Sequence, residues 1–229
     1  MSARTSARTP SLRSERDLQK IAATVLRLAK THGIREAEVQ IDESIEALTR
    51  FANNAIHQHV AEHGLVVSIR TVVDARTARV TTNRIDEDAL RDAVQSAASL
   101  SAQQPKDSHL LPMLGKQKYR SVRRFHPGTA ALSAEDRARA VRSACQLAEK
   151  QGQIAAGIFS SGQNHCLLAN SRGLSAAHRK DALAITVRGL LVEHALARER
   201  SEHVLRDDEG PHVRVVHGAV PVQVPERRL

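Results

Sequence analysis

Histidines are the residues of this chain best suited to chemistry, because neutral imidazole binds zinc and can carry protons near neutral pH. The 229-residue sequence contains twelve of them, and one local cluster is formed by His57, His59 and His63. On an extended strand these positions share one face, so their imidazoles could converge on a metal ion. The neighbouring Glu62 would point to the opposite face, which leaves the cluster without a fourth ligand. An exposed polar strand face is therefore favoured over a metal site.

A zinc peptidase helix needs two histidines one turn apart, with a glutamate directly after the first to activate water. None of the twelve histidines is followed by glutamate. Glu193 and His194 stand in the reverse order, and no second histidine has the required spacing. We therefore predict no catalytic residue, no metal ligand and no cofactor in this chain.

Other reactive groups give no complete site either. Cys145 falls on the apolar face of an expected helix, which favours a buried, inert thiol. The Ser160-Ser161-Gly162 stretch lacks the strained elbow of serine hydrolases, and no glycine-rich phosphate loop occurs. With Cys166 as the second cysteine and no C-x-x-C pair, reduced thiols and a cytoplasmic location are expected.

The charge balance raises the question of nucleic acid. Lys and Arg number 34 against 25 Asp and Glu, a formal net charge of +9, and such a surface attracts polyanions. The basic residues look scattered along the sequence, however, and aromatic residues that could stack on bases make up 2%. Nucleic acid is therefore an unlikely partner, and a basic nucleic-acid-binding module stays an alternative. No stretch approaches the ~20 consecutive apolar residues of a membrane span, so no membrane association is expected.

The elements that would position these side chains follow from hydrophobic periodicity. A period of 3.6 with capping residues predicts helices over 14–31, 86–100 and 133–152. A period of 2 predicts strands over 36–44, 45–51, 56–62, 65–73, 77–83, 154–160, 166–170 and 181–188. His63-Gly64 and the residues around Ala75 are predicted turns.

The predicted fold class is α+β, with an antiparallel sheet or sheets and helices packed on one face. Two helix-plus-strands halves are expected, joined by a proline-containing linker. The expected segments are a disordered tail over 1–13, a first domain over 14–101, a linker over 102–132, a second half over 133–190, and a weakly structured, divergent tail over 191–229.

Longer stretches of sequence carry a family resemblance. The segment LTRFANNAIHQHVAE at 48–62, with LVVSIRTVV at 65–73 and DARTARVTTN at 74–83, resembles the amino-terminal domain of the TldD/PmbA family. This family is also called modulator of DNA gyrase. The likeness continues through AGIFSSG at 156–162 and LANSRGL at 168–174, and covers about residues 14–190.

The resemblance implies a function. TldD-type members are zinc metalloproteases that act on peptides and unfolded segments, and PmbA-type partners look similar but lack the zinc helix. The family's zinc residues lie after the region matched here, so no catalytic residue can be carried over. The resemblance implies the amino-terminal region of a metalloprotease subunit involved in proteolysis, inactive alone and without the zinc-binding domain. Expected partners are a TldD/PmbA-type subunit, a second copy, or the peptide substrate of the assembly.

Two features bear on what the chain does within such an assembly. The aperiodic ending after about residue 190 favours a truncated copy over a stand-alone module, and a non-catalytic scaffold subunit docking on an intact protease stays an alternative. Arg50, Asn53, Asn54 and His57 are the candidate peptide- or partner-facing residues, because strand alternation breaks there. An exposed sheet edge at this place could pair with an extended peptide. An ordinary solvated turn is the alternative interpretation.

Overall fold

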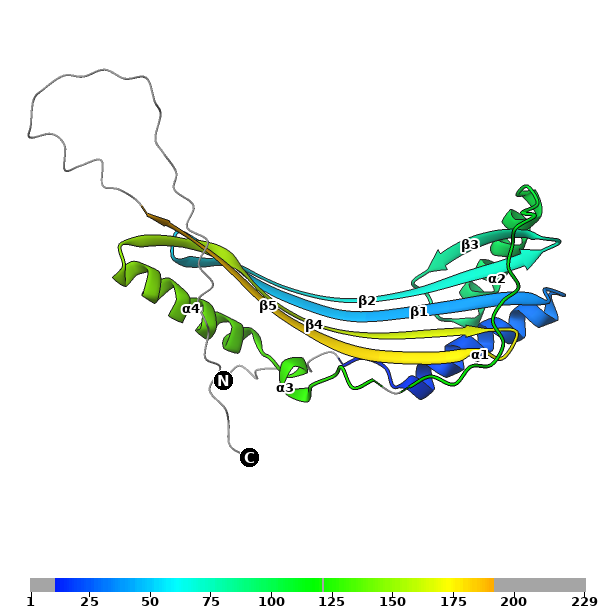
Figure 1. Ribbon diagram of the computed structural model, residues 1–229, viewed down its shortest axis with the longest axis horizontal. Coiled ribbons are helices and arrows are strands. Elements are labelled where there is room, and N and C mark those ends of the chain that lie inside the picture. The colour runs from blue at the N-terminus through cyan, green and yellow to red at the C-terminus, as the bar shows by residue number, and fades with distance from the viewer. Residues whose placement is uncertain (1–10, 121, 192–229) are drawn as a thin grey trace, which may run out of the picture. The chain divides into compact units, whose positions relative to one another are not determined.

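The computed structural model describes residues 11–120 and 122–191. Five strands form one antiparallel sheet in the order β3-β2-β1-β4-β5, and helices pack against it (Figure 1). The elements are α1 (Glu15–Thr31), β1 (Glu36–Ala52), β2 (Ala55–Val73), β3 (Arg76–Thr82), α2 (Glu87–Gln103), α3 (Pro127–Ala130), α4 (Ala134–Lys150), β4 (Gln153–Asn170) and β5 (Ser175–Leu191). The predicted α+β class is confirmed.

The described residues divide into two compact units, each assembled from separated segments. Unit 1 comprises the described parts of 1–47, 61–132 and 161–183, and unit 2 those of 48–60, 133–160 and 184–229. Strands β1, β2, β4 and β5 each contribute residues to both units. Of the predicted tails, residues 1–10 and 192–229 lie outside the described part of the chain. No helix within that part is long and apolar enough to cross a membrane.

The core of unit 1 is formed by the apolar faces of two capped helices. Ser14 and Asp86 each accept a hydrogen bond from a backbone amide in the first turn of α1 and α2, which satisfies donors left free at a helix start. The two helices pack on alternate residues of the sheet. The buried cluster comprises Leu18, Ala22, Val25, Leu28 and Ala29 of α1, Leu90, Ala93, Val94 and Ala97 of α2, and Ala37, Val39, Ile41, Val67, Ile69, Leu167 and Ala169 of the strands, together with Ile34.

Unit 2 has a smaller core beneath α4. This helix begins with a capping box, in which Ser133 and Asp136 bond reciprocally to each other's backbone amides. The core comprises Val141 and Cys145 of α4, Phe51 of β1, and Ala155 and Phe159 of β4. Cys145 is thus buried, as the sequence predicts.

The predicted turn at His63-Gly64 is wrong, because β2 runs unbroken from Ala55 to Val73. The chain reverses instead at Asn53 and Asn54, whose φ angles are 51° and 58°. Consecutive left-handed residues are what a two-residue hairpin turn requires, and asparagine tolerates that conformation better than most residues. The predicted turn between β2 and β3 is correct: Asp74 and Ala75 have positive φ.

The predicted breaks inside the other long strands are also wrong. Residues 36–52 form one strand rather than two, and β4 passes through Gly162 without interruption from Gln153 to Asn170. Strands of 17 to 19 residues exceed the usual 3–10, so each small or polar position within them resembles a strand end. In the expected linker over 102–132, α2 extends to Gln103 and the short helix α3 forms at Pro127–Ala130.

Candidate functional site

The β1–β2 turn of unit 2 contains the four residues singled out from the sequence. Asn54 is half-buried and its side chain makes two hydrogen bonds: Nδ2 donates to the Gln153 carbonyl at 3.0 Å, and Oδ1 accepts from the Ala155 amide at 2.6 Å. Its own backbone amide donates to the Ala155 carbonyl at 3.2 Å. Asn54 therefore ties the turn to the first residues of β4.

The other three residues at this turn leave polar groups at the surface. Arg50, Asn53 and His57 are all exposed. The Arg50 guanidinium donates to Gln58 Oε1 at 3.4 Å, a contact between neighbouring strands. The structure brings Arg50, Asn53 and His57 to the end of one hairpin, and contact of these residues with a peptide or partner stays a prediction.

The three histidines of β2 do not contact a common group. His59 Nδ1 lies 2.9 Å from the hydroxyl of buried Thr49, and His63 Nε2 lies 2.8 Å from Glu43 Oε1. His57 is exposed. Across residues 11–120 and 122–191, no group of three or more His, Cys, Asp or Glu side chains is arranged to hold a metal ion.

A buried carboxylate in unit 1 was not foreseen from the sequence. The Glu43 side chain has no solvent exposure, and it accepts hydrogen bonds from the Arg13 amide at 2.8 Å and from the Arg13 guanidinium. With His63 as a third neighbour, the carboxylate is paired and hydrogen-bonded, as a buried charge must be. The buried His165 contacts the Arg13 carbonyl at 3.0 Å. These contacts join Arg13, the last residue of the predicted tail, to β1 and β4.

The sequence does carry a signal for this carboxylate. Glu43 continues the alternation of Ala37, Val39 and Ile41, so it occupies a core-facing position of a half-buried strand. A carboxylate–imidazole pair serves catalysis where it can activate a neighbouring hydroxyl or thiol. The groups bonded to Glu43 include no hydroxyl or thiol, so the pair has no nucleophile to activate and its evident role is structural.

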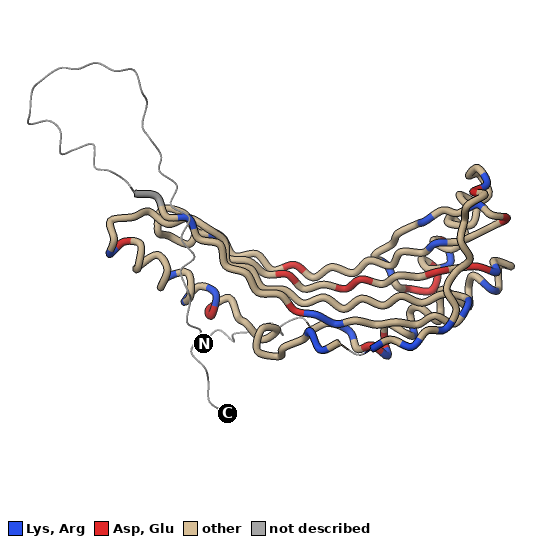
Figure 2. Tube along the Cα trace, in the orientation of Figure 1, with Lys and Arg blue, Asp and Glu red and all other residues tan. Residues whose placement is uncertain are grey.

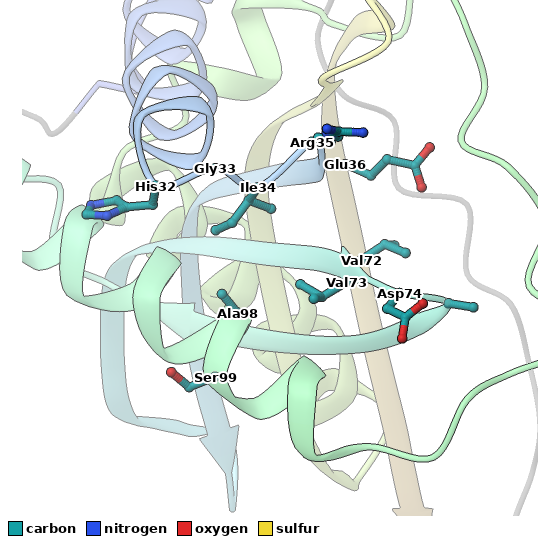
Figure 3. Close-up of a pocket in the computed structure, with 11 residues that line it drawn as sticks. His32, Gly33, Ile34, Arg35, Glu36, Val72, Val73, Asp74, Ala98 and Ser99 are labelled. Atoms are coloured by element: carbon teal, nitrogen blue, oxygen red, sulfur yellow. The ribbon is translucent and has the colours of Figure 1, made fainter.

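A hollow of about 630 Å³ opens in unit 1 where the end of α1, the β2–β3 turn and α2 meet. Figure 3 shows Ile34, Val73 and Ala98 close together within it, while His32 and Glu36 extend away in different directions. The two carboxylates at its border are engaged elsewhere: Glu36 pairs with Arg172, and Asp74 with Lys106. Arg35, which also lines the hollow, is exposed. The Lys106 ammonium lowers the pKa of Asp74. A single exposed cation beside an apolar floor is not a catalytic arrangement.

Both thiols are poor nucleophiles. Burial raises the pKa of Cys145 on α4, with a further contribution from the negative charge of Glu149. Burial, together with the nearby Asp42 carboxylate, raises the pKa of Cys166 on β4 to about 11. Thiolate is the reactive form, so these cysteines lack the electropositive surroundings of a catalytic thiol.

Comparison with known families finds a match for a segment that contributes residues to both units. Residues 37–101 match the sequence model described as PmbA/TldA metallopeptidase domain 1. This segment contains most of β1, all of β2 and β3, and nearly all of α2. The resemblance to the TldD/PmbA amino-terminal domain is thereby confirmed. No curated protein matches the chain in sequence.

Solved structures share the fold. TldE from Thermococcus kodakarensis superposes with a TM-score of 0.71 at 15% identity, covering 77% of this chain and 40% of that one. A protein described as a modulator of a DNA gyrase from Thermotoga maritima gives 0.66 at 17% identity, covering 77% and 40%. A similarly described protein from Bacteroides thetaiotaomicron gives 0.65 at 16%, covering 80% and 43%. At these identities the likeness shows the fold alone, and the aligned region spans about 40% of the first two relatives.

Proposed function

Because residues 37–101 match the sequence model of a PmbA/TldA metallopeptidase first domain, we propose that the chain acts as a non-catalytic amino-terminal part of a TldD/PmbA-type peptidase subunit in the cytoplasm. The family match over 37–101 is the observation that carries this proposal. Its task is then to hold a partner subunit or a peptide, while hydrolysis takes place elsewhere in the assembly. A fold alone does not define a function, so the residues of the site must agree with it.

The chemistry of the described residues agrees with a non-catalytic role. Glu43 and His63 are engaged in fixing the chain, both thiols have raised pKa values, and no set of side chains among the described residues suits a zinc ion. Zinc-dependent hydrolysis would therefore use residues outside those described here or residues of a partner subunit.

A scaffold subunit that docks on an intact protease is the second candidate, and the β1–β2 hairpin favours it. Arg50, Asn53 and His57 are exposed at its end, and the turn beneath them is held in place through Asn54. A rigid turn with exposed polar side chains loses little conformational entropy when a partner binds.

The proposal predicts that activity depends on a partner. The full chain, purified alone, should hydrolyse neither casein nor a labelled peptide in a chelator-sensitive manner with added zinc. Mixed with a TldD-type subunit that has an intact zinc motif, it should form a complex detectable by gel filtration with light scattering. Chelator-sensitive turnover by the pure chain, or failure to form any complex with such a subunit, would contradict the proposal.

A double variant tests the hairpin as the docking surface. Arg50→Ala with His57→Ala should weaken the complex about tenfold, because a few surface residues carry most of the energy of an interface. The matched control is Arg142→Ala with Gln146→Ala, which removes one exposed cation and one exposed neutral polar side chain of α4 in the same unit. Equal weakening by both pairs would show that net charge, and not the hairpin, matters.

A further inference from the structure

Unit 1 contains a concentration of unpaired positive charge in the segment before α3. Residues 116–124 include five cations, Lys116, Lys118, Arg120, Arg123 and Arg124, and the sequence from 108 to 134 contains no acidic residue. All five cations are exposed. None of them forms an ion pair with another residue that the structure describes.

This segment is held beside β5, the last strand of the sheet. At one end, Asn170 Nδ2 donates to the Leu114 carbonyl at 2.9 Å. At the other, the Asp181 amide donates to the Arg124 carbonyl at 3.0 Å, and Arg124 forms a parallel bridge with Lys180. Figure 1 shows the green segment following the edge of the sheet toward α3. The backbone of the basic segment is thus fixed at both ends.

The distance between the two anchors is longer than a helix of this length would cover, and residues 116–120 and 122–123 form neither helix nor strand. Gly115 approaches the Arg172 carbonyl, before β5 begins, and Arg124 lies beside Lys180 within β5. The strand portion alone covers about 17 Å at ~3.3 Å per residue, whereas a helix of the intervening length would cover only about 14 Å.

Strand β5 adds to this charge. Lys180 is exposed beside Arg124 and makes no ion pair with a described residue. Arg179 lies 3.8 Å from the centre of the Phe125 ring and donates to Gln163 Oε1, so one face of Phe125 is covered. Figure 2 shows Lys and Arg positions gathered along this edge of the sheet. We call residues 116–120 and 122–124 together with Lys180 the basic strip.

We propose that the basic strip binds an acidic peptide segment in an extended conformation. Six exposed cations that form no ion pair with a described residue attract carboxylates, and their spread beside β5 suits carboxylates spaced along an extended peptide. The acidic side chain next to Lys180, that of Asp181, is 5% exposed and pairs with His126. Single-stranded nucleic acid is less well matched, because Tyr119 is the one exposed ring in the described part of the strip and bases need rings to stack on. Binding of an acidic peptide goes beyond the proposed function and does not require a partner subunit. An experiment can therefore contradict the peptide proposal without contradicting the proposed function, and the reverse.

Fluorescence anisotropy with the full-length chain tests the proposal. The probe is a labelled twelve-residue peptide of alternating Glu and Gly, and its counterpart has Gln in place of every Glu. The strip variant is Lys116→Gln, Lys118→Gln, Arg120→Gln. The control variant is Arg16→Gln, Lys30→Gln, Arg142→Gln, which removes the same charge from exposed positions of α1 and α4. Thermal unfolding followed by circular dichroism verifies that both variants fold.

The Glu peptide should bind the native chain at about 50 mM salt, and the Gln peptide should not. The strip variant should lose about tenfold in affinity and the control variant less than twofold, because salt screens charges beyond ~10 Å at 0.1 M. If the strip variant and the control variant lose affinity equally, binding depends only on net charge, and the proposal is wrong. Tighter binding of a twelve-nucleotide single-stranded DNA, lost in the strip variant, would also overturn it by assigning the strip to nucleic acid.

Discussion

The two asparagines of the β1–β2 turn share a left-handed backbone conformation but differ in what their side chains do. Asn54 bonds to the backbone of Gln153 and Ala155, whereas Asn53 is exposed. Glycine adopts positive φ without strain, so replacing either residue with glycine separates the side-chain role from the backbone role.

Asn54→Gly should lower the free energy of unfolding by about 1–3 kcal/mol, because it leaves the Gln153 carbonyl and the Ala155 amide without their partner. Asn53→Gly should change it by less than ~0.5 kcal/mol. Urea unfolding followed by circular dichroism measures both values. Equal effects of the two substitutions would show that the amide bonds of Asn54 contribute nothing to stability.

Single residues also mark the limit of what the sequence predicts. Arg50, Asn53 and His57 were found because they interrupt an alternating pattern, and the structure places all three at the surface. Glu43 was missed although it obeys the pattern, because its three hydrogen bonds come from Arg13 and His63, which lie 30 and 20 positions away in the sequence. Periodicity places a residue on a face, and it carries no information on which distant chain segment will pair with it.

Among the elements, the helices were predictable and the strand ends were not. Capping residues Ser14, Asp86 and Ser133 mark where α1, α2 and α4 begin, and each of these signals acts within three or four residues. The strands are long enough to contain glycines and polar residues that resemble turns. Whether Gly162 ends a strand depends on its neighbours across the sheet, which the local sequence does not specify.

Two glycines of β4 test how closely neighbouring chains approach this strand. A Cβ on Gly157 would overlap the Thr186 carbonyl oxygen and lie 2.7 Å from Phe51 Cζ. On Gly162 it would lie 3.4 Å from the Ile45 carbonyl oxygen, an ordinary contact. Gly157→Ala should therefore destabilise the protein by about 1–3 kcal/mol or prevent folding.

Gly162→Ala is the matched control, and its stability should equal that of the native chain or exceed it by up to ~1 kcal/mol, because alanine reduces the entropy of the unfolded chain. Thermal unfolding of the two variants under identical conditions gives the comparison. A Gly157→Ala variant as stable as Gly162→Ala would mean that the strands separate at this position without cost.

At the scale of the whole molecule, the fold brings together residues that lie far apart in the sequence. Basic residues look scattered along the chain, yet the bridge between Arg124 and Lys180 brings the cations of residues 116–124 beside those of β5. The same holds for the sheet, in which β1 lies between β2 and β4 although about 100 residues separate β1 from β4. The fold class followed from local patterns, whereas the strand order and the charged surface depend on contacts between distant segments.

The two cysteines report on unfolding of the whole molecule, because Cys145 belongs to unit 2 and Cys166 to unit 1. At pH 8, a pKa of about 11 leaves roughly 0.1% of Cys166 as thiolate, against about 10% at the ordinary value of 9.0. Native Cys166 should therefore react with iodoacetamide about a hundredfold more slowly than in urea. Because the folded state favours the neutral thiol, this contribution to stability is present below pH 9 and disappears as the pH rises toward 11.

Four strands contribute residues to both units, so we expect the units to unfold together. In single-thiol variants, Cys145→Ala and Cys166→Ala, the remaining thiol should become reactive at the urea concentration where the circular dichroism of the same variant is lost. Comparing each variant with its own unfolding curve removes the effect of the substitution on stability. Labelling of Cys145 at a distinctly lower urea concentration than the loss of sheet signal would show instead that unit 2 opens separately, since α4 covers a core of few residues.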